Sequence, residues 1–184
     1  MSELQIVDAA EIGRMITRIA TQIIESNKGS ENLGFVGIVR RGDVLARRLA
    51  KEIKRLENRD IPVGAIDITL YRDDLQLAFE MPTVQASSIP FDVTNMTIVL
   101  ADDVLYTART VRAALSEILD FGRPRVIQLA VLVDRAHREL PIGADFVGKH
   151  ISAPKDEIID VCFQETDGRE GIFVKKRDLE EEKQ

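Results

Sequence analysis

Four short, largely apolar runs constrain the fold of this chain more than any other feature. They span residues 35–39, 63–70, 97–101 and 126–133. Such runs, in which apolar side chains do not alternate with polar ones, are typical of strands that are buried on both faces of a parallel sheet. The sequence therefore predicts an α/β fold with a mainly parallel central sheet that is flanked by helices on both faces.

Helical patterns lie between these runs. Asp8 followed by Glu11 is typical of a capping box at the start of a first helix, and Gly122 with Pro124 is typical of the end of a third. The first helix is rich in isoleucine and offers an apolar surface for self-association. Three segments place apolar residues at helical spacing: Ile12, Ile16, Ile19 and Ile23; Leu45, Leu49, Ile53 and Leu56; Val111, Leu115 and Ile118.

Two segments lack a sustained pattern. Residues 71–91 contain prolines and paired serines, and we expect them to form a flexible lid over a binding site. Residues 145–174 indicate short strands and turns, and we expect a small hood near Asp134, Arg135 and residues 146–149. We expect one domain over residues 1–175, followed by a charged tail over residues 176–184.

Composition narrows the classes of function. The chain has 31 acidic and 25 basic residues, a formal net charge of -6, so any contact with nucleic acid would need a local basic patch. Cys162 is the single cysteine, which excludes an internal disulfide and favours a reducing cytoplasm. No apolar run approaches the roughly 18 residues of a membrane span, and the first residues lack the pattern of a signal peptide.

Residues 98–110 carry the chemistry. An apolar strand delivers Asp102 and Asp103, and Thr107 to Thr110 then begin a helix. Two carboxylates can accept hydrogen bonds from vicinal ribose hydroxyls and attract Mg²⁺, while free amides at a helix start can surround a phosphate. The segment therefore predicts a site for a phosphorylated ribose.

The acidic pair has two other interpretations. A lone pair of aspartates is more often part of a turn or a solvated helix start. Paired aspartates also occur in Mg²⁺-binding phosphoacceptor domains, but there the pair lies near the first strand, whereas here it follows about a hundred residues.

The segment resembles the phosphoribosyl pyrophosphate (PRPP) binding motif of type I phosphoribosyltransferases. The rest of the chain is similar to the PyrR family of pyrimidine operon attenuators, which are also uracil phosphoribosyltransferases. The matching stretches run in order along the chain and comprise residues 67–74, 102–106, 122–124, 128–135, 137–142 and 144–149.

The resemblance implies that uracil and PRPP react to give UMP and pyrophosphate, with Mg²⁺ as cofactor. It also implies UMP-dependent binding to the leader mRNA of a pyrimidine operon, and a homo-oligomer that is a dimer or larger. Such a transfer develops oxocarbenium character at the ribose. Positioning and electrostatic preorganisation can therefore supply most of the rate without a nucleophilic side chain.

The resemblance also implies roles for individual residues. Asp102 and Asp103 would hold the ribose hydroxyls and Mg²⁺, and Arg72, with Tyr71, would close over the site as a further catalytic group. The PRPP-binding residues would be Arg40, Arg41, Gly42, Ile98, Val99, Leu100, Ala101, Asp102, Asp103, Val104, Leu105, Tyr106, Thr107, Ala108, Arg109 and Thr110. The base would meet Asp134, Arg135, Phe146, Val147 and Lys149. RNA would meet Thr17, His137, Arg138 and Lys149.

The sequence departs from the family pattern at several of these positions. Ala108 and Ala136 stand where the family usually has glycine, and Arg40 stands where it usually has threonine. Gly143 replaces a usual arginine and Thr21 a frequent histidine on the surface expected to meet RNA. An alanine at positive φ costs roughly 1–2 kcal/mol, which is about tenfold in affinity for each 1.4 kcal/mol.

Three hypotheses about activity follow. The protein is an active uracil phosphoribosyltransferase, or an RNA-binding attenuator that senses UMP with weak or lost catalysis, or a paralogue that keeps nucleotide binding alone.

Overall fold

The structure is a computed structural model that describes residues 3–68, 87–154 and 156–176. Most of the expected lid, with Tyr71 and Arg72, lies outside the described residues, and so do residues 177–184 of the expected tail. Among the described residues, no helix combines the length and hydropathy that crossing a membrane requires.

A five-stranded sheet forms the centre of the protein. Its strands are β3 (Val63–Ile66), β2 (Leu33–Ile38), β4 (Thr97–Leu105), β5 (Val126–Asp134) and β6 (Phe146–His150), in that order across the sheet. Every neighbouring pair is parallel. The predicted parallel sheet is therefore confirmed, and β4 lies at its middle.

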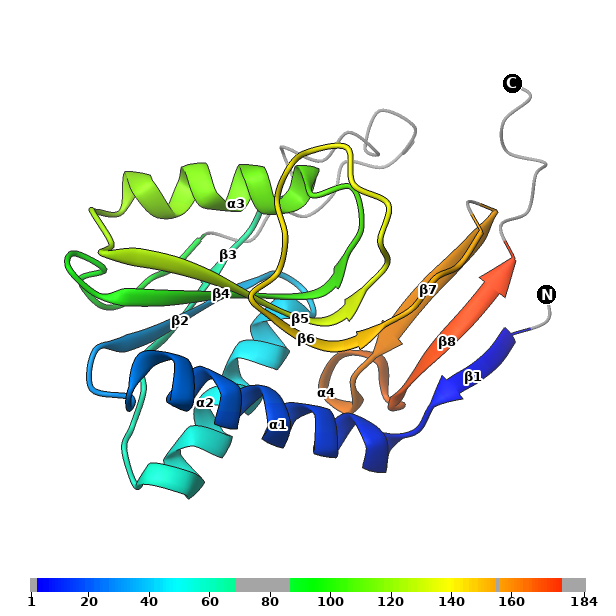
Figure 1. Cartoon of the computed structure of the whole chain (residues 1–184), viewed down its shortest axis with the longest axis horizontal. Coiled ribbons are helices and arrows are strands. Elements are labelled where there is room, and N and C mark those ends of the chain that lie inside the picture. The colour runs from blue at the N-terminus through cyan, green and yellow to red at the C-terminus, as the bar shows by residue number, and fades with distance from the viewer. Residues whose placement is uncertain (1–2, 69–86, 155, 177–184) are drawn as a thin grey trace.

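Helices cover both faces of this sheet (Figure 1). On one face lie α1 (Ala9–Asn27) and α2 (Gly42–Glu57), and on the other lies α3 (Arg109–Asp120). Burial of apolar side chains drives this layering. The alternate side chains of β4 divide between the two resulting cores, with Val99 in the core of α1 and α2 and Leu100 in the core of α3.

The first helix begins and faces inward as its sequence predicts. The Asp8 carboxylate accepts a hydrogen bond of 2.7 Å from the backbone amide of Glu11, which satisfies an amide that the first turn leaves free. Ile12, Ile19 and Ile23 are fully buried in the core. The expectation that this isoleucine-rich face serves self-association is therefore wrong, because the sheet and α2 already cover it.

A second, three-stranded sheet stands beside the first. Its strand order is β1 (Glu3–Val7), β8 (Gly171–Lys176) and β7 (Glu157–Cys162), all antiparallel, with the short helix α4 (Gln164–Asp167) between β7 and β8. The two ends of the chain thus meet in one sheet, as Figure 1 shows on its right-hand side. The sequence predicted short strands in this region but gave no sign of β1. The last strand extends through Lys176, one residue past the expected domain boundary.

Two strands differ in length from the predicted runs. The third strand ends at Ile66 rather than continuing to residue 70, and the amide of Asp67 bonds to the Ser87 side chain instead. By contrast, β4 continues past Ala101 to Leu105, because its backbone keeps pairing with β5 although Asp102 and Asp103 interrupt the apolar run.

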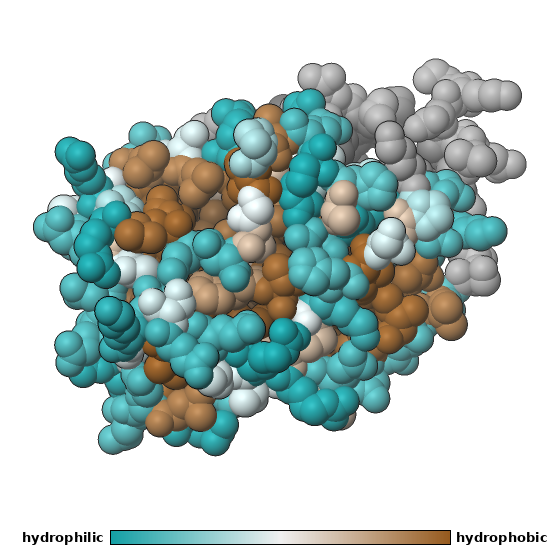
Figure 2. Space-filling view, viewed as in Figure 1, coloured by the Kyte–Doolittle hydropathy of each residue, from teal (hydrophilic) through white to brown (hydrophobic). Residues whose placement is uncertain are grey.

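Most of the surface in Figure 2 is hydrophilic. Large apolar side chains that remain exposed lie in the second sheet, at Leu4 and Ile158, and around the end of α3, at Leu119 and Phe121. These positions are not part of the motif at the end of β4.

Candidate active site

The carboxyl ends of β2 and β4 bring two predicted loops together. After the roles that the resemblance implies, we call residues 40–42 the pyrophosphate loop and residues 106–110 the phosphate loop. The Arg41 guanidinium lies 3.8 Å from the Asp103 carboxylate, measured from Nη1 to Oδ2. The predicted convergence of the loop after β2 with the acidic pair is therefore present in the structure.

Asp102 and Asp103 lie within the extended end of β4, not after it as the sequence suggested. Oδ1 of Asp102 accepts the backbone amide of Asp103 at 3.0 Å, and Oδ1 of Asp103 accepts that of Val104 at 2.9 Å. Burial raises the pKa of the Asp103 carboxyl, and the nearby charge of Arg41 offsets only part of that effect. The strand backbone thus fixes the orientation of both carboxylates.

The acidic pair fits a magnesium ion that arrives with its substrate. Mg²⁺ prefers oxygen ligands and is usually held by one or two carboxylates together with substrate phosphates. Asp102 and Asp103 supply such a pair of hard donors. Within the described residues, no group of three or more histidine, cysteine, aspartate or glutamate side chains could hold a metal ion.

The phosphate loop leads directly into α3. Thr107 and Ala108 precede Arg109, the first residue of the helix, and the first turn carries no acidic side chain. The free amides and the positive end of the helix dipole therefore face no competing carboxylate from that turn. This arrangement matches the predicted cradle for a 5′-phosphate.

Alanine occupies two positions of positive φ in the site. Ala108 has φ +73° and Ala136 has φ +62°, a region in which glycine carries no steric penalty. Both alanines stand at positions where the PyrR pattern usually has glycine. The suspected strain at Ala108 is thus a real feature of the backbone, and a similar strain exists at Ala136.

Gly42 has a packing role in the pyrophosphate loop. A β-carbon at this position would lie 2.3 Å from the carbonyl oxygen of Ala101 and 3.0 Å from Cα of Asp102. The start of α2 therefore approaches β4 beside the acidic pair, and glycine permits that contact. This contact is distinct from the close approach of the Gly42 backbone to pyrophosphate that the resemblance implies. Arg40 is exposed, and the peptide bond before it is cis.

Arg41 is held by two carboxylates that the sequence analysis missed. Its guanidinium contacts Asp160 of β7 at 2.6 Å and Asp167 of α4 at 2.9 Å. Burial would lower the pKa of Arg41, but hydrogen bonds to Asp167 and Asp160 outweigh burial and raise it. Lys175 also contacts Asp160, at 2.6 Å. The sequence did carry a signal for Asp160, because it is an acidic residue inside the otherwise apolar stretch 158–163.

The hood loop, which we define as residues 134–140, follows β5 and arches beside the start of α3 (Figure 1). The Arg135 guanidinium lies 4.3 Å from the ring centroid of Tyr106 and donates a hydrogen bond of 2.6 Å to the carbonyl of Pro154. Asp134 accepts the amide of Ala136 at 2.9 Å. Two residues expected to meet the base, Asp134 and Arg135, therefore lie next to the phosphate loop.

The other residues expected to meet the base lie on β6. Phe146 is 6% exposed and belongs to the core that contains α1, so its ring is covered by protein and does not line the cleft. Val147 and Lys149 line a groove of about 550 Å³ between α1 and β6. Arg135 is also 6% exposed, so Phe146 and Arg135 are both largely covered by protein, whereas Asp134 is half-buried.

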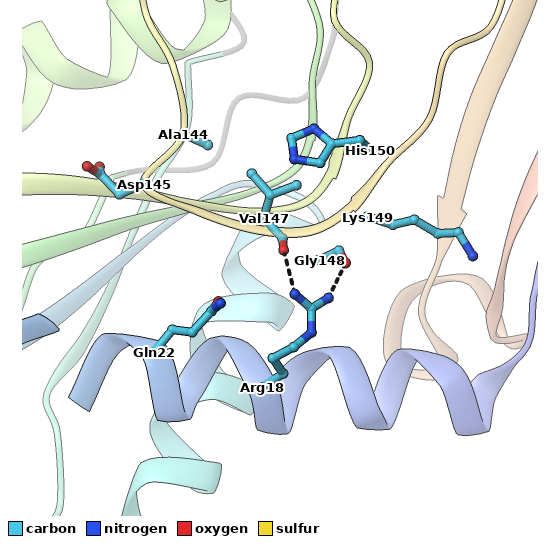
Figure 3. Close-up of a pocket in the computed structure, with 8 residues that line it drawn as sticks. All are labelled: Arg18, Gln22, Ala144, Asp145, Val147, Gly148, Lys149 and His150. Carbon is cyan, nitrogen blue, oxygen red and sulfur yellow. Dashed lines mark hydrogen bonds between the residues drawn. The ribbon is translucent and has the colours of Figure 1, made fainter. Parts of the chain in front are cut away.

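Figure 3 shows that groove, where Arg18 reaches from α1 to the carbonyls of Val147 and Gly148. The Lys149 ammonium pairs with Glu11 at 2.7 Å, and the Thr17 hydroxyl donates to Glu52 at 2.7 Å. These two residues expected to meet RNA therefore already have acidic partners within the protein.

The remaining two residues expected to meet RNA lie in the hood loop. His137 Nδ1 lies 3.1 Å from the carbonyl oxygen of Arg135, and the His137 ring lies 6.0 Å from that of Tyr106. Arg138 is directed inward and pairs with Asp134 at 2.5 Å. The hood loop thus places His137 and Arg138 close to Tyr106 of the phosphate loop.

A parallel sheet whose central strand carries two aspartates, one buried and one half-buried, to the start of a helix is typical of phosphoribosyltransferases. In agreement, residues 2–165 match the family described as phosphoribosyl transferase domain. Two bacterial relatives are each named bifunctional protein PyrR. The one from Pelotomaculum thermopropionicum is 55% identical over 92% of this chain and 94% of its own. The one from Roseiflexus sp. is 54% identical over 95% of this chain and 96% of its own. The chain therefore belongs to the PyrR family of phosphoribosyltransferases.

Solved structures support the fold independently. A hypoxanthine phosphoribosyltransferase from Trypanosoma cruzi, solved with the product IMP, superposes with a TM-score of 0.71 at 17% identity, over 94% of this chain and 93% of the other. A hypoxanthine-guanine phosphoribosyltransferase from Bacillus anthracis gives a TM-score of 0.67 at 16% identity, over 94% and 96% of the two chains. The expected fold, enzyme class and family are confirmed.

Proposed function

We propose that this protein transfers the phosphoribosyl group of PRPP to uracil, giving UMP and pyrophosphate, and regulates pyrimidine genes by binding RNA when UMP is bound. The observation that carries the enzymatic proposal is the contact between Arg41 and Asp103. It places the pyrophosphate loop beside the acidic pair, which precedes the phosphate loop by only a few residues. Leaving group, ribose and 5′-phosphate would then have adjoining sites.

The residues of this chain would act mainly by positioning. Asp102 and Asp103 would accept the ribose hydroxyls, the first-turn amides of α3 would bind the 5′-phosphate, and Arg41 would stabilise the charge that develops on pyrophosphate. Mg²⁺, held by Asp102 and Asp103 together with PRPP, would add Lewis-acid stabilisation of the leaving group. Tyr106 and Arg135 would border the base.

A direct assay tests this proposal. Purified protein with PRPP, uracil and Mg²⁺ should form UMP, and Asp102→Asn or Asp103→Asn should lower kcat by about a hundredfold or more, the scale of losing a preorganised electrostatic group. Asp60→Asn is a matched control, because Asp60 is an exposed carboxylate that pairs with Lys54. Absence of UMP from the unmodified protein would refute the proposal.

The conformation of one residue, Ala108, favours a second candidate function. Ala108 combines positive φ with near-complete burial at 3% exposure, so its methyl group has little room to move away from a bound phosphate. A protein that binds UMP and senses it, with weak or lost catalysis, is the alternative that follows. Tight UMP binding without UMP synthesis would select this alternative over the enzyme.

The RNA-binding part of the proposal rests on the basic residues around α1 and the hood loop. Lys149, Arg18 and His150 line the groove in Figure 3, and a groove of this kind can attract a phosphate backbone. The ion pair of Lys149 with Glu11 competes with RNA, so we expect weak binding that is sensitive to salt.

Gly143 offers a sharp test of the RNA proposal. It is exposed, and a β-carbon placed there would meet nothing within 4 Å. Gly143→Arg should therefore fold normally and strengthen binding to a pyrimidine leader hairpin in the presence of UMP. Leu56→Arg is a charge-matched control, because Leu56 is an exposed residue near the end of α2 and is part of neither the groove nor the hood loop. No binding by either the original protein or Gly143→Arg, with or without UMP, would remove the RNA-binding role.

The proposal also includes a homo-oligomer in the cytoplasm. Leu119, Phe121 and Val126 are exposed apolar residues near the end of α3 and are better candidates for a subunit contact than the buried face of α1. A cytoplasmic location suits Cys162, which is free and buried. Analytical ultracentrifugation should give a dimer or a larger species, whereas a monomer at all concentrations would refute the oligomer.

A further inference from the structure

The hood loop is attached to the phosphate loop along its backbone. The amides of Glu139 and Leu140 both donate to the carbonyl of Thr107, at 3.1 and 3.3 Å. The amide of Arg135 donates to the carbonyl of Leu105 at 2.9 Å. The chain between Asp103 and the start of α3 is therefore held from the side by a loop that follows a different strand.

Arg138 makes the most extensive of these attachments. Its Nη1 donates to the carbonyls of Leu105, at 3.3 Å, and Tyr106, at 2.8 Å. Its Nη2 donates to Asp134 at 2.5 Å, and its Nε donates to the carbonyl of Ile142 at 3.0 Å. The side chain is only 23% exposed. All three guanidinium nitrogens are thus used within the protein, two of them at the boundary of the phosphate loop and the hood loop.

These contacts require an arginine. The planar guanidinium presents several donors in a fixed fork, whereas a lysine ammonium is a compact charge that cannot reach separate acceptors in the same plane. Leu105 is the last residue of β4 and pairs with Asp134, the last residue of β5. Arg138 therefore continues the connection between the two strands after their ladder ends, where the chain turns toward Ala108.

We propose that Arg138 is a positioning residue for the phosphate loop, and that through it nucleotide binding and the conformation of the hood loop are energetically linked. This inference rests on the proposed function only in using UMP as the ligand. By linkage, a nucleotide that prefers the attached phosphate loop also favours the attached hood loop, and the coupling is reciprocal. Arg138 thus acts on the nucleotide site from within the protein rather than as an exposed RNA contact.

Nucleotide binding without any RNA tests the proposal. Arg138→Lys and Arg138→Gln should weaken UMP binding about tenfold in calorimetric titration, the effect of losing a charge-assisted hydrogen bond. The KM for PRPP should rise with a smaller change in kcat. Arg48→Lys is a matched control, because Arg48 is 20% exposed and pairs with Glu165 and Glu170. Unchanged UMP affinity in both Arg138 variants would overturn the proposal.

Amide hydrogen exchange in the free protein provides a second readout. Residues 105–110 should exchange faster in Arg138→Lys than in the original protein, while Arg48→Lys should leave that segment unchanged. Exchange that is unaffected by Arg138→Lys would also overturn the proposal. This measurement needs no ligand, so if the original protein fails to bind UMP, the proposed function fails while exchange still decides the role of Arg138.

Discussion

The phosphate loop and the pyrophosphate loop lie side by side but are held in different ways. The phosphate loop is attached to the hood loop chiefly by hydrogen bonds to its backbone carbonyls, for example from the amides of Glu139 and Leu140 to Thr107. The pyrophosphate loop is attached to the second sheet by ion pairs, in which Arg41 contacts Asp160 and Asp167.

The two loops therefore differ in whether the contacts that fix their geometry also neutralise their charge. Hydrogen bonds to uncharged carbonyls fix a loop without adding negative charge to it, so the carboxylate of Glu139, which pairs with Arg109 at 2.6 Å, is the acidic group of the hood loop that meets the positive helix end. Ion pairs fix a loop and also neutralise it. Pyrophosphate must therefore compete with Asp160 and Asp167 for Arg41, and the stability of this part of the site should depend on pH and salt.

The largest expected effect comes from removing the cation of the pyrophosphate loop. Arg41→Gln should lower kcat about a hundredfold and lower the free energy of unfolding by about 2–3 kcal/mol, because Asp103, Asp160 and Asp167 lose a shared partner. Steady-state kinetics and urea unfolding measure the two effects. Full activity in Arg41→Gln would contradict the proposed difference between the two loops, because the pyrophosphate loop would then need no cation.

The next largest effect is a loss of stability at low pH. Burial would raise the pKa of the Asp160 carboxyl, but hydrogen bonds from Lys175 and Arg41 outweigh it and lower the pKa. The stabilisation is therefore fully present above the unfolded value of about 3.9 and is lost as pH falls through the lower, folded value. Asp160→Asn should cost about 1–2 kcal/mol at pH 7 and less at pH 3.

Chemical unfolding at several pH values measures this dependence. A matched change at an exposed carboxylate that pairs with a single lysine, Asp60→Asn, should leave the pH dependence of the unfolding free energy unchanged. An equal loss of stability for Asp160→Asn at pH 7 and pH 3 would contradict the ionic account of the pyrophosphate loop.

The smallest effect concerns the backbone of the phosphate loop. Ala108→Gly removes the penalty of a β-carbon at φ +73° and should add about 1 kcal/mol of stability, partly offset by the entropy of glycine. UMP affinity should rise by up to about tenfold. Ala136→Gly, at φ +62°, should add similar stability with less effect on affinity. Thermal unfolding and calorimetry check both variants, and weaker UMP binding by Ala108→Gly would contradict the strain.

The sequence predicted the parts of the protein that repeat a local pattern. The apolar runs and helical stripes located the central sheet and its three helices, and the capping box at Asp8 marked the start of α1. The motif at residues 98–110 located the acidic pair and the helix start. In each case neighbouring residues carry the signal, so no knowledge of distant contacts was needed.

The parts that the sequence did not predict depend on distant contacts. β1 is short and pairs with β8 at the other end of the chain, so no local run marks it. Asp160 and Asp167 are about 120 residues from Arg41, and their role emerges only when the second sheet folds beside β4. The inward direction of Arg138 likewise follows from the backbone carbonyls of Leu105 and Tyr106, which carry no sequence signal.

The most direct test of the central claim is calorimetric titration of the protein with UMP, and with PRPP plus Mg²⁺, compared with its Asp103→Asn variant. The account predicts saturable binding of both ligands by the original protein, and PRPP binding that is weakened by at least tenfold in the variant. Equal PRPP binding by the two proteins would show that the ribose site does not lie at Asp102 and Asp103, and would contradict the account.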